Sequence, residues 1–128
     1  MDDINIEQEI QDKGLTAPRV TLADIDANIV TEHYFTAEHG VYGVAAWNAD
    51  SETKVSSVVF QDPEPLRLLT FCVIVLRNGF TVTGESACAS QENFDEELGR
   101  KIARQNAVNK IWPLMGYALK EKLSKEFK

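Results

Sequence analysis

The chain has 128 residues and a mass of 14.3 kDa, the size of one domain with one core. Its apolar fraction of 44% and charged fraction of 26% are those of an ordinary globular protein, which argues against disorder throughout. A net charge of −7 and an isoelectric point near 4.8 argue against a general binder of nucleic acids or anionic membranes, because such proteins use a broad basic surface. We therefore predict a single domain over residues 1–128, with no nucleic acid and no membrane among its partners.

The first 19 residues are mostly polar and charged, and their last part belongs to the sequence GLTAPRV, which contains a glycine and a proline. This composition predicts a flexible arm or a short, fraying helix over residues 1–19. The opening MDDINIEQEI has neither the basic start nor the apolar run of a signal peptide. No stretch approaches the ~18 uninterrupted apolar residues of a membrane span. The sequence therefore predicts a cytoplasmic protein.

A short helix is predicted in VTLADIDANIV, because Thr21 and Asp24 have the spacing of a capping box. Apolar residues recur there at helical spacing: Leu22, Ile25 and Ile29. The following EHYFTAEHGVYGVAAWN mixes aromatic residues with glycines, and we predict irregular structure with at most a short strand. Residues 48–56 and 61–65 are polar and rich in turn formers, so one of them is predicted to be a mobile loop.

The clearest local pattern is LLTFCVIVLRNGFTVTGESAC, in which Asn78 and Gly79 separate two β-rich runs. Asn-Gly is typical of a type I′ hairpin turn, and a two-residue loop pairs Arg77 with Phe80. This register predicts three further opposing pairs: Val75 with Val82, Val73 with Gly84, and Cys72 with Glu85. The first run is apolar on both faces and the second alternates, which predicts a central strand beside a half-exposed one.

The two cysteines, Cys72 and Cys88, do not have the spacing of a CxxC metal site. The predicted register places Cys88 opposite Leu69, roughly 10 Å along the ladder from Cys72 and too far for a disulfide. No histidine close in sequence supports a reactive thiol. We predict reduced cysteines without a catalytic role.

A helix is predicted after SACASQENFDEE, whose carboxylates crowd the first turns, where the helix dipole favours negative charge. Projection at ~100° per residue predicts a core face formed by five apolar residues: Phe94, Leu98, Ile102, Val108 and Trp112. Pro113 predicts a stop or a kink, followed by a second amphipathic segment with a lysine-rich end. The expected fold is α+β, with an antiparallel sheet centred on the hairpin of residues 69–88 and helices packed on one face.

Common enzyme signatures are missing from the sequence: there is no GxSxG elbow, no phosphate loop ending in GK[ST] and no HExxH. His33 and His39 flank an aromatic stretch without an evident metal partner, and such histidines are usually surface residues. The carboxylates of residues 92–97 fit dipole compensation better than an acid–base pair. We therefore predict no catalytic residue, no metal and no cofactor, and a protein that is not an enzyme.

The sequence LGRKIARQNAVNKIW concentrates cations in an otherwise acidic chain. Glu96 and Glu97 lie four residues before Arg100 and Lys101, so intrahelical ion pairs explain part of the pattern without a ligand. Arg104 has Arg100 rather than a carboxylate four residues before it. Two adjacent guanidinium groups can bind a phosphate or a pyrophosphate. Two interpretations remain open here, a solvated helix face and an anion site.

Residues 69–123, from LTFCVIVLRNGFTVTGESAC to GYALKEKL, resemble a family of small tailed-phage proteins named after gene 49 of a coliphage and gene 66 of a Shigella phage. GLTAPRVTLADIDANI and YFTAEHGVYG are similar to the N-terminal half of that family, so the resemblance covers most of the chain. The family has long been described only as phage proteins of unknown function.

That family is in turn similar to the Thoeris anti-defence proteins that act as sponges, which are non-enzymatic oligomers that capture cyclic ADP-ribose isomers. The similarity implies that Arg100 and Arg104 bind a pyrophosphate and that Phe80 stacks on adenine. It also implies that Arg19 or Lys13 completes the positive charge. The roles of Phe80, Arg19 and Lys13 are assigned by residue type and expected proximity to the two arginines.

The implied function is that of a phage-encoded, non-enzymatic binding protein that sequesters a phosphorylated cyclic nucleotide-type immune signal in the host cytoplasm. The alternative is an acidic protein–protein inhibitor or adaptor that acts on a host protein. A homo-oligomer, a dimer or higher, is expected because apolar strand surface and several aromatic residues need cover: Tyr34, Phe35, Tyr42 and Trp47.

Overall fold

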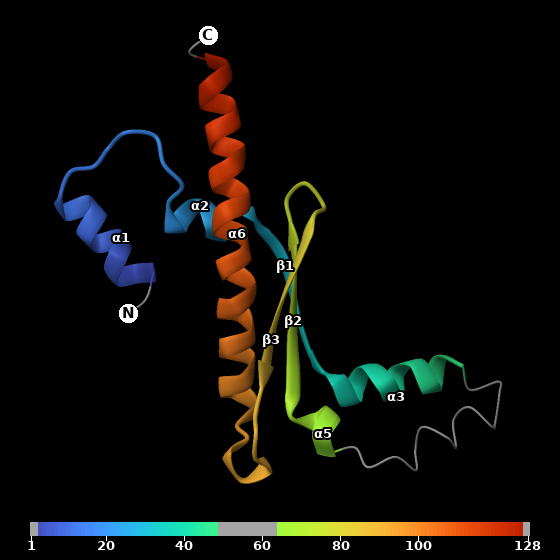
Figure 1. Ribbon diagram of the computed structural model, residues 1–128. Coiled ribbons are helices and arrows are strands. Elements are labelled where there is room, and N and C mark those ends of the chain that lie inside the picture. The colour runs from blue at the N-terminus through green and yellow to red at the C-terminus, as the bar shows by residue number, and fades with distance from the viewer. Residues whose placement is uncertain (1–2, 49–63, 127–128) are drawn as a thin grey trace.

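The computed structural model describes residues 3–48 and 64–126. Its elements in chain order are α1 (Asp3–Asp12), α2 (Leu22–Asn28), β1 (Ile29–Thr36), α3 (Ala37–Trp47), α5 (Glu64–Arg67), β2 (Leu69–Leu76), β3 (Thr81–Ala87), a 3₁₀ turn η1 (Gln91–Asn93) and α6 (Glu96–Glu126) (Figure 1). The predicted α+β class is confirmed. Of the two segments in which a mobile loop was predicted, residues 49–56 and 61–63 lie outside the described residues, and residues 64 and 65 begin α5.

The strands form one antiparallel sheet in the order β1-β2-β3, with β2 in the centre as predicted. α6 lies across one face of the sheet, while α3 projects from the opposite side near the end of β1 (Figure 1). Residues of β2 alternate between buried positions under α6 and half-buried positions on the other face. The core therefore lies between the sheet, α2 and α6, and its buried members are Ile25, Cys72, Ile74, Leu76, Val82, Ala103, Ala107, Val108 and Ile111.

The hairpin loop is one residue longer than the predicted type I′ turn. Leu76 N donates to Phe80 O at 2.8 Å, and Gly79 N donates to Leu76 O at 2.9 Å. Gly79 has a φ of 90°, whereas Asn78 has a negative φ. A type I′ turn needs positive φ at both central residues, so the loop is instead a type I turn followed by a left-handed glycine.

The longer loop shifts the strand register by one residue from the predicted one. Gly84, not Glu85, lies opposite Cys72, and Ala87, not Cys88, lies opposite Leu69. A slip of one residue exchanges the two faces of a strand. It places Gly84 of β3 on the same face as buried Cys72, under α6. Both cysteines are free, in agreement with the predicted absence of a disulfide.

α6 contacts the sheet through small residues rather than through the predicted large ones. A Cβ built on Gly84 would lie 2.1 Å from Ala103 O and 2.3 Å from Ala107 N, so the backbones of β3 and α6 are in direct contact. The predicted core face is therefore wrong for Leu98 and Ile102, which are 53% and 43% exposed. The buried residues of α6 are Gly99, Ala103, Ala107, Val108 and Ile111, of which the prediction included only Val108.

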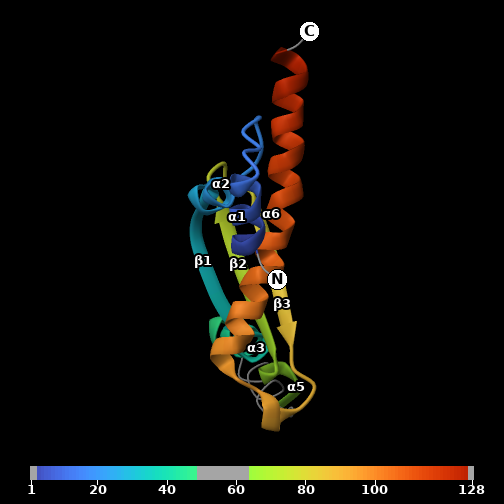
Figure 2. The same cartoon turned by 90° about the vertical axis from the view of Figure 1, so that its left-hand side faces the viewer.

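α6 runs through Pro113, so the two helices predicted on either side of this residue are one helix of 31 residues. Proline removes one backbone donor, and packing on both sides of it holds the helix together. Ile111 is fully buried and Met115 packs against the core. The C-terminal half of α6 extends beyond the sheet (Figures 1 and 2).

Capping boxes begin the helices α2 and α3, which precede the hairpin. The predicted box of Thr21 and Asp24 is confirmed at the start of α2. A second box begins α3, where Thr36 Oγ1 accepts from His39 N at 3.3 Å and His39 Nδ1 accepts from Thr36 N at 3.0 Å. The prediction of irregular structure with at most a short strand over residues 32–48 is therefore wrong for α3, whose start was missed because a histidine takes the place of the usual carboxylate or amide of a capping box.

Candidate functional site

A cavity of about 400 Å³ lies between α2, the hairpin turn and the C-terminal half of α6. Three cations from three different segments line it: Arg19, Arg77 and Lys122. Asp24 is the one carboxylate in the lining, and most of the remaining wall is apolar: Val20, Ala27, Met115, Ala118 and Leu119. This volume and this mixture of apolar walls with a few polar groups are typical of small-molecule sites. We call this cavity the basic pocket.

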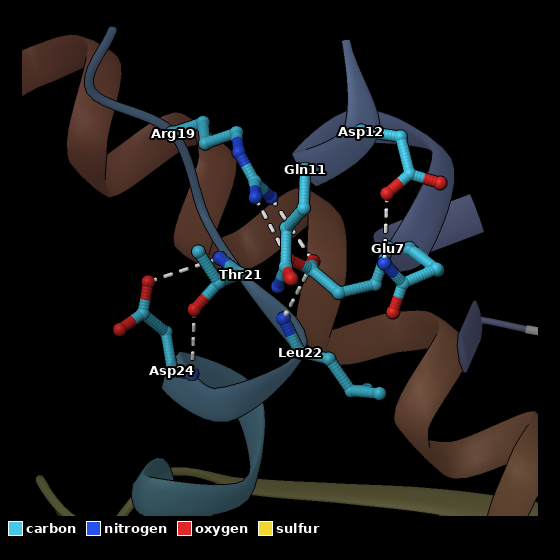
Figure 3. A network of polar contacts seen from close by, with 8 residues as sticks. Glu7, Gln11, Asp12, Arg19, Thr21, Leu22 and Asp24 are labelled. Carbon is cyan, nitrogen blue, oxygen red and sulfur yellow. Dashed lines mark hydrogen bonds and ion pairs between the residues drawn. The ribbon is translucent and has the colours of Figure 1, made fainter. Parts of the chain in front are cut away.

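Arg19 is held in place by Glu7 of α1 (Figure 3). Its Nη1 donates to Glu7 Oε1 at 3.0 Å and its Nη2 donates to Oε2 at 2.7 Å. Glu7 also accepts from Gln11 Nε2 at 2.9 Å. These bonds, that of Arg19 first, lower the pKa of Glu7 to about 2. The Arg19 guanidinium is therefore fixed at the pocket wall with its charge balanced.

Arg77 joins the hairpin turn to the end of α2. Its backbone N–H donates to Asn28 Oδ1 at 3.1 Å, and its Nη2 donates to Ala27 O at 2.6 Å. A cation at a helix C-terminus satisfies free carbonyl groups and is favoured by the helix dipole. The Ala27 carbonyl is neutral, so the charge of Arg77 is not cancelled by this bond.

Lys122 reaches the basic pocket from the projecting half of α6. Within residues 3–48 and 64–126 it forms no ion pair. With Arg19 and Glu7 counted as a neutral pair, the pocket has two cations, Arg77 and Lys122, against the single carboxylate of Asp24. It is therefore a locally positive site on a protein whose net charge is −7.

The arginines predicted to bind pyrophosphate have carboxylate partners. Arg104 Nε and Nη2 donate to the two carboxylate oxygens of Glu32 on β1 at 3.0 and 3.1 Å. Tyr34 Oη also donates to Glu32, at 2.6 Å. The bond from Arg104 is the main cause of the lowered pKa of Glu32, while burial, followed by the bond to Glu32, raises the pKa of Tyr34. Arg100 pairs with Glu96, as the sequence predicted.

The structure does not bring the five predicted ligand residues together. Arg19 alone among them lines the basic pocket. Phe80 is 56% exposed and lies at the same hairpin turn as Arg77. Lys13, which directly follows α1, forms an ion pair with Glu9 at 3.0 Å. Sequence reasoning missed Arg77 and Lys122, although Arg77 directly precedes the Asn-Gly turn and Lys122 belongs to the lysine-rich end.

The described ranges contain no group of three or more histidine, cysteine, aspartate or glutamate residues that could hold a metal ion. In the same ranges, none of the helices combines the length and the apolar character that crossing a membrane requires.

No curated protein and no solved structure matches the chain. A family model described as "Phage protein (N4 Gp49/phage Sf6 gene 66) family" matches residues 20–123. This range holds α2, the three strands, most of α6 and all of the basic-pocket lining except Arg19. The chain therefore belongs to the N4 Gp49/phage Sf6 gene 66 family of phage proteins.

Proposed function

We propose that this phage protein is a non-enzymatic binding protein that sequesters a phosphorylated cyclic nucleotide-type immune signal in the host cytoplasm, with the basic pocket as its binding site. The observation that carries the proposal is the pocket itself, an apolar-walled cavity of about 400 Å³ in which Arg77 and Lys122 outnumber the one carboxylate, Asp24, on an acidic chain. Membership of a phage family supports a role in an infected cell.

The chemistry of the lining fits a ligand with a phosphate at one side and a ring system at the other. The guanidinium of Arg77 and the ammonium of Lys122 can form charge-assisted hydrogen bonds to phosphate oxygens. Met115 and Leu119 offer a soft, apolar surface to a base or a ribose. Phe80 remains a candidate for stacking, since its ring is exposed at the turn that presents Arg77.

The proposed site differs from the one inferred from the resemblance to signal sponges. Arg104 has two of its guanidinium nitrogens on Glu32, and Arg100 is paired with Glu96, so a ligand there would have to break existing ion pairs. A cyclic ADP-ribose isomer stays the leading ligand class, with its pyrophosphate on Arg77 and Lys122.

Calorimetric titration tests the proposal with a panel of a cyclic ADP-ribose isomer, ADP-ribose, a 3′,5′-cyclic mononucleotide and inorganic pyrophosphate. We expect the wild-type chain to bind a cyclic member and to release it chemically intact. Lys122→Ala should weaken that binding at least ten-fold, since it removes a charged hydrogen-bond donor worth roughly 1.5–3 kcal/mol. Lys120→Ala is the matched control, because Lys120 is exposed on the same helix and does not line the pocket.

The other outcomes are equally informative. Loss of binding in Arg104→Ala with wild-type binding in Lys122→Ala would move the site to the first half of α6. Conversion of the ligand would show an enzyme. Failure of every panel member to bind would favour the alternative, an acidic inhibitor or adaptor of a host protein.

A further inference from the structure

One face of the sheet is open in the described part of the chain. Opposite α6, only one end of the sheet is covered, by α3 and α5 (Figure 1). The strand pairing places eleven residues on this face, which we call the bare sheet face: Thr31, His33, Phe35, Leu69, Phe71, Val73, Val75, Thr81, Thr83, Glu85 and Ala87. The rings of Phe35 and Phe71 contact one another with centroids 5.7 Å apart. Phe35 is still 37% exposed.

α3 projects from the sheet (Figures 1 and 2), and one of its faces has no partner in the described part of the chain. Its exposed residues at helical spacing form what we call the α3 stripe: Gly40, Gly43, Val44 and Trp47. Val44 is 62% exposed and Trp47 is 90% exposed, whereas Ala45 on the inner side of the same helix is buried. Exposed large apolar groups that gather in this way mark an interaction surface.

The two glycines of the α3 stripe have no explanation within the described chain. Glycine inside a helix is unfavourable relative to alanine, because it loses more backbone freedom on folding. A Cβ added to Gly40 or Gly43 would meet nothing within 4 Å. Gly84, by contrast, is required by the close approach of α6. A pair of glycines on an exposed helix face leaves its backbone open to an equally close approach by a partner.

We propose that the partner is a second copy of this chain, in a two-fold symmetric dimer in which the α3 stripe of each copy lies on the bare sheet face of the other. The chain carries both halves of such a contact, a projecting apolar helix and an open apolar sheet face, as an isologous interface requires. None of these residues lines the basic pocket, so the dimer does not depend on the proposed function.

Area and charge support this arrangement. The exposed apolar parts of the two surfaces amount to on the order of 500 Å² per copy, with Trp47 the largest contributor. A standard interface buries about 800 Å² per partner, of which about 60% is apolar. Each copy has a net charge of −7, yet the α3 stripe has no charged residue and the bare sheet face has one carboxylate, Glu85. Two copies can therefore meet there without opposing many like charges.

The mass in solution tests the proposal. At micromolar concentration, sedimentation equilibrium should give twice 14.3 kDa for the wild-type chain. Gly43→Ala should weaken the dimer at least ten-fold while the helix content is kept. Gly116→Ala is the matched control, since Gly116 is also an exposed helical glycine with open space around it, and it should leave the dimer unchanged. A monomeric wild-type chain, or a Gly43→Ala chain that dimerises normally, would overturn the proposal.

Mixing two variants tests the reciprocal geometry. Val44→Asp alters only the α3 stripe and Thr83→Lys alters only the bare sheet face, and both positions are exposed, so the monomer fold should be preserved. Each variant alone should be monomeric, because both of its contacts are damaged. An equimolar mixture should recover dimers, since one of the two contacts is then wild type. A mixture that stays monomeric would overturn the reciprocal arrangement, and a Val44→Asp chain that still dimerises would show direct sheet-to-sheet packing instead.

Discussion

Thr70 is a buried hydroxyl without a hydrogen-bond partner in the described part of the chain. Its side chain lies between β2 and α6, with a relative exposure of 2%. A Cβ built on Gly99 would lie 3.2 Å from Thr70 Oγ1, which shows how closely the helix covers it. The hydroxyl therefore lost its water on folding without gaining a protein partner, which is unfavourable.

We expect Thr70→Val to raise the free energy of unfolding by about 1–2 kcal/mol, because it removes an unsatisfied polar group and keeps the shape. Urea denaturation measures this change. Thr36→Val is the matched control, since Thr36 lies opposite Thr70 in the sheet and its hydroxyl caps α3. The Thr36→Val substitution should lower the free energy of unfolding by about 1 kcal/mol. Loss of stability in Thr70→Val would mean that its hydroxyl has a partner, such as a buried water.

Arg104 and Arg100 are expected to differ in their effect on stability. Arg104→Ala breaks a bidentate pair with Glu32 and leaves a half-buried carboxylate, so it should cost about 1–2 kcal/mol. Arg100→Ala removes an exposed pair within one helix and should cost at most about 0.5 kcal/mol. Thermal unfolding distinguishes them. Equal effects of the two substitutions would show that the Glu32 pair contributes no more than a surface pair.

At the level of elements, the packing of α6 on β3 depends on Gly84. Gly84→Ala places a methyl group against the backbone of Ala103 and Ala107, where no side-chain rotation can relieve the clash. We expect a loss of about 3 kcal/mol or more, measured by denaturant unfolding. Gly116→Ala, at an open helical position, should instead gain about 0.5–1 kcal/mol. Normal stability in Gly84→Ala would contradict the close contact of β3 with α6.

At the level of the whole molecule, α1 is attached to the rest of the chain by polar contacts. Glu7 binds Arg19, and Asp3 Oδ2 accepts from Trp112 Nε1 and from Gln105 Nε2, both at 3.3 Å. No residue of α1 is buried. The attachment of α1 should therefore depend on the charge of Glu7, which forms the ion pair with Arg19.

The pH dependence of this attachment follows from the pKa of Glu7. That pKa is about 2 in the folded chain and 4.5 in a free carboxyl group. The contribution of Glu7 is therefore fully present above about pH 4.5 and is lost as the pH falls towards 2. The fluorescence of Trp112, followed in a Trp47→Phe chain, should shift to the red over this range as α1 detaches. Far-UV circular dichroism in parallel separates detachment from global unfolding.

Glu7→Gln provides the control for this titration. The substitution removes the charge, so α1 should be loosely attached at neutral pH and the acid transition of Trp112 should largely disappear. An unchanged transition in Glu7→Gln would show that the charge of Glu7 does not control the attachment of α1.

Local interactions could be predicted because they join residues close in sequence. The capping box of Thr21 and Asp24, the position of the hairpin turn at Gly79 and the pairing of Glu96 with Arg100 each span at most four residues. Each of these interactions is stabilised within a single turn of helix or a single β-turn, so it does not depend on the rest of the fold. The sequence by itself therefore determined the α+β class, the central strand and the positions of several element boundaries.

The tertiary structure decided what depends on contacts between distant residues. The predicted core face of α6 was wrong for Leu98 and Ile102, because a helix that touches a strand backbone at Gly84 needs alanines there. The carboxylate that binds Arg104 belongs to Glu32 on β1, which is 72 residues away in the sequence. The basic pocket joins Arg19, Arg77 and Lys122, three cations from separate segments. The distances between these segments cannot be predicted from their spacing in the sequence, because they are set only when the sheet, α2 and α6 pack into one core.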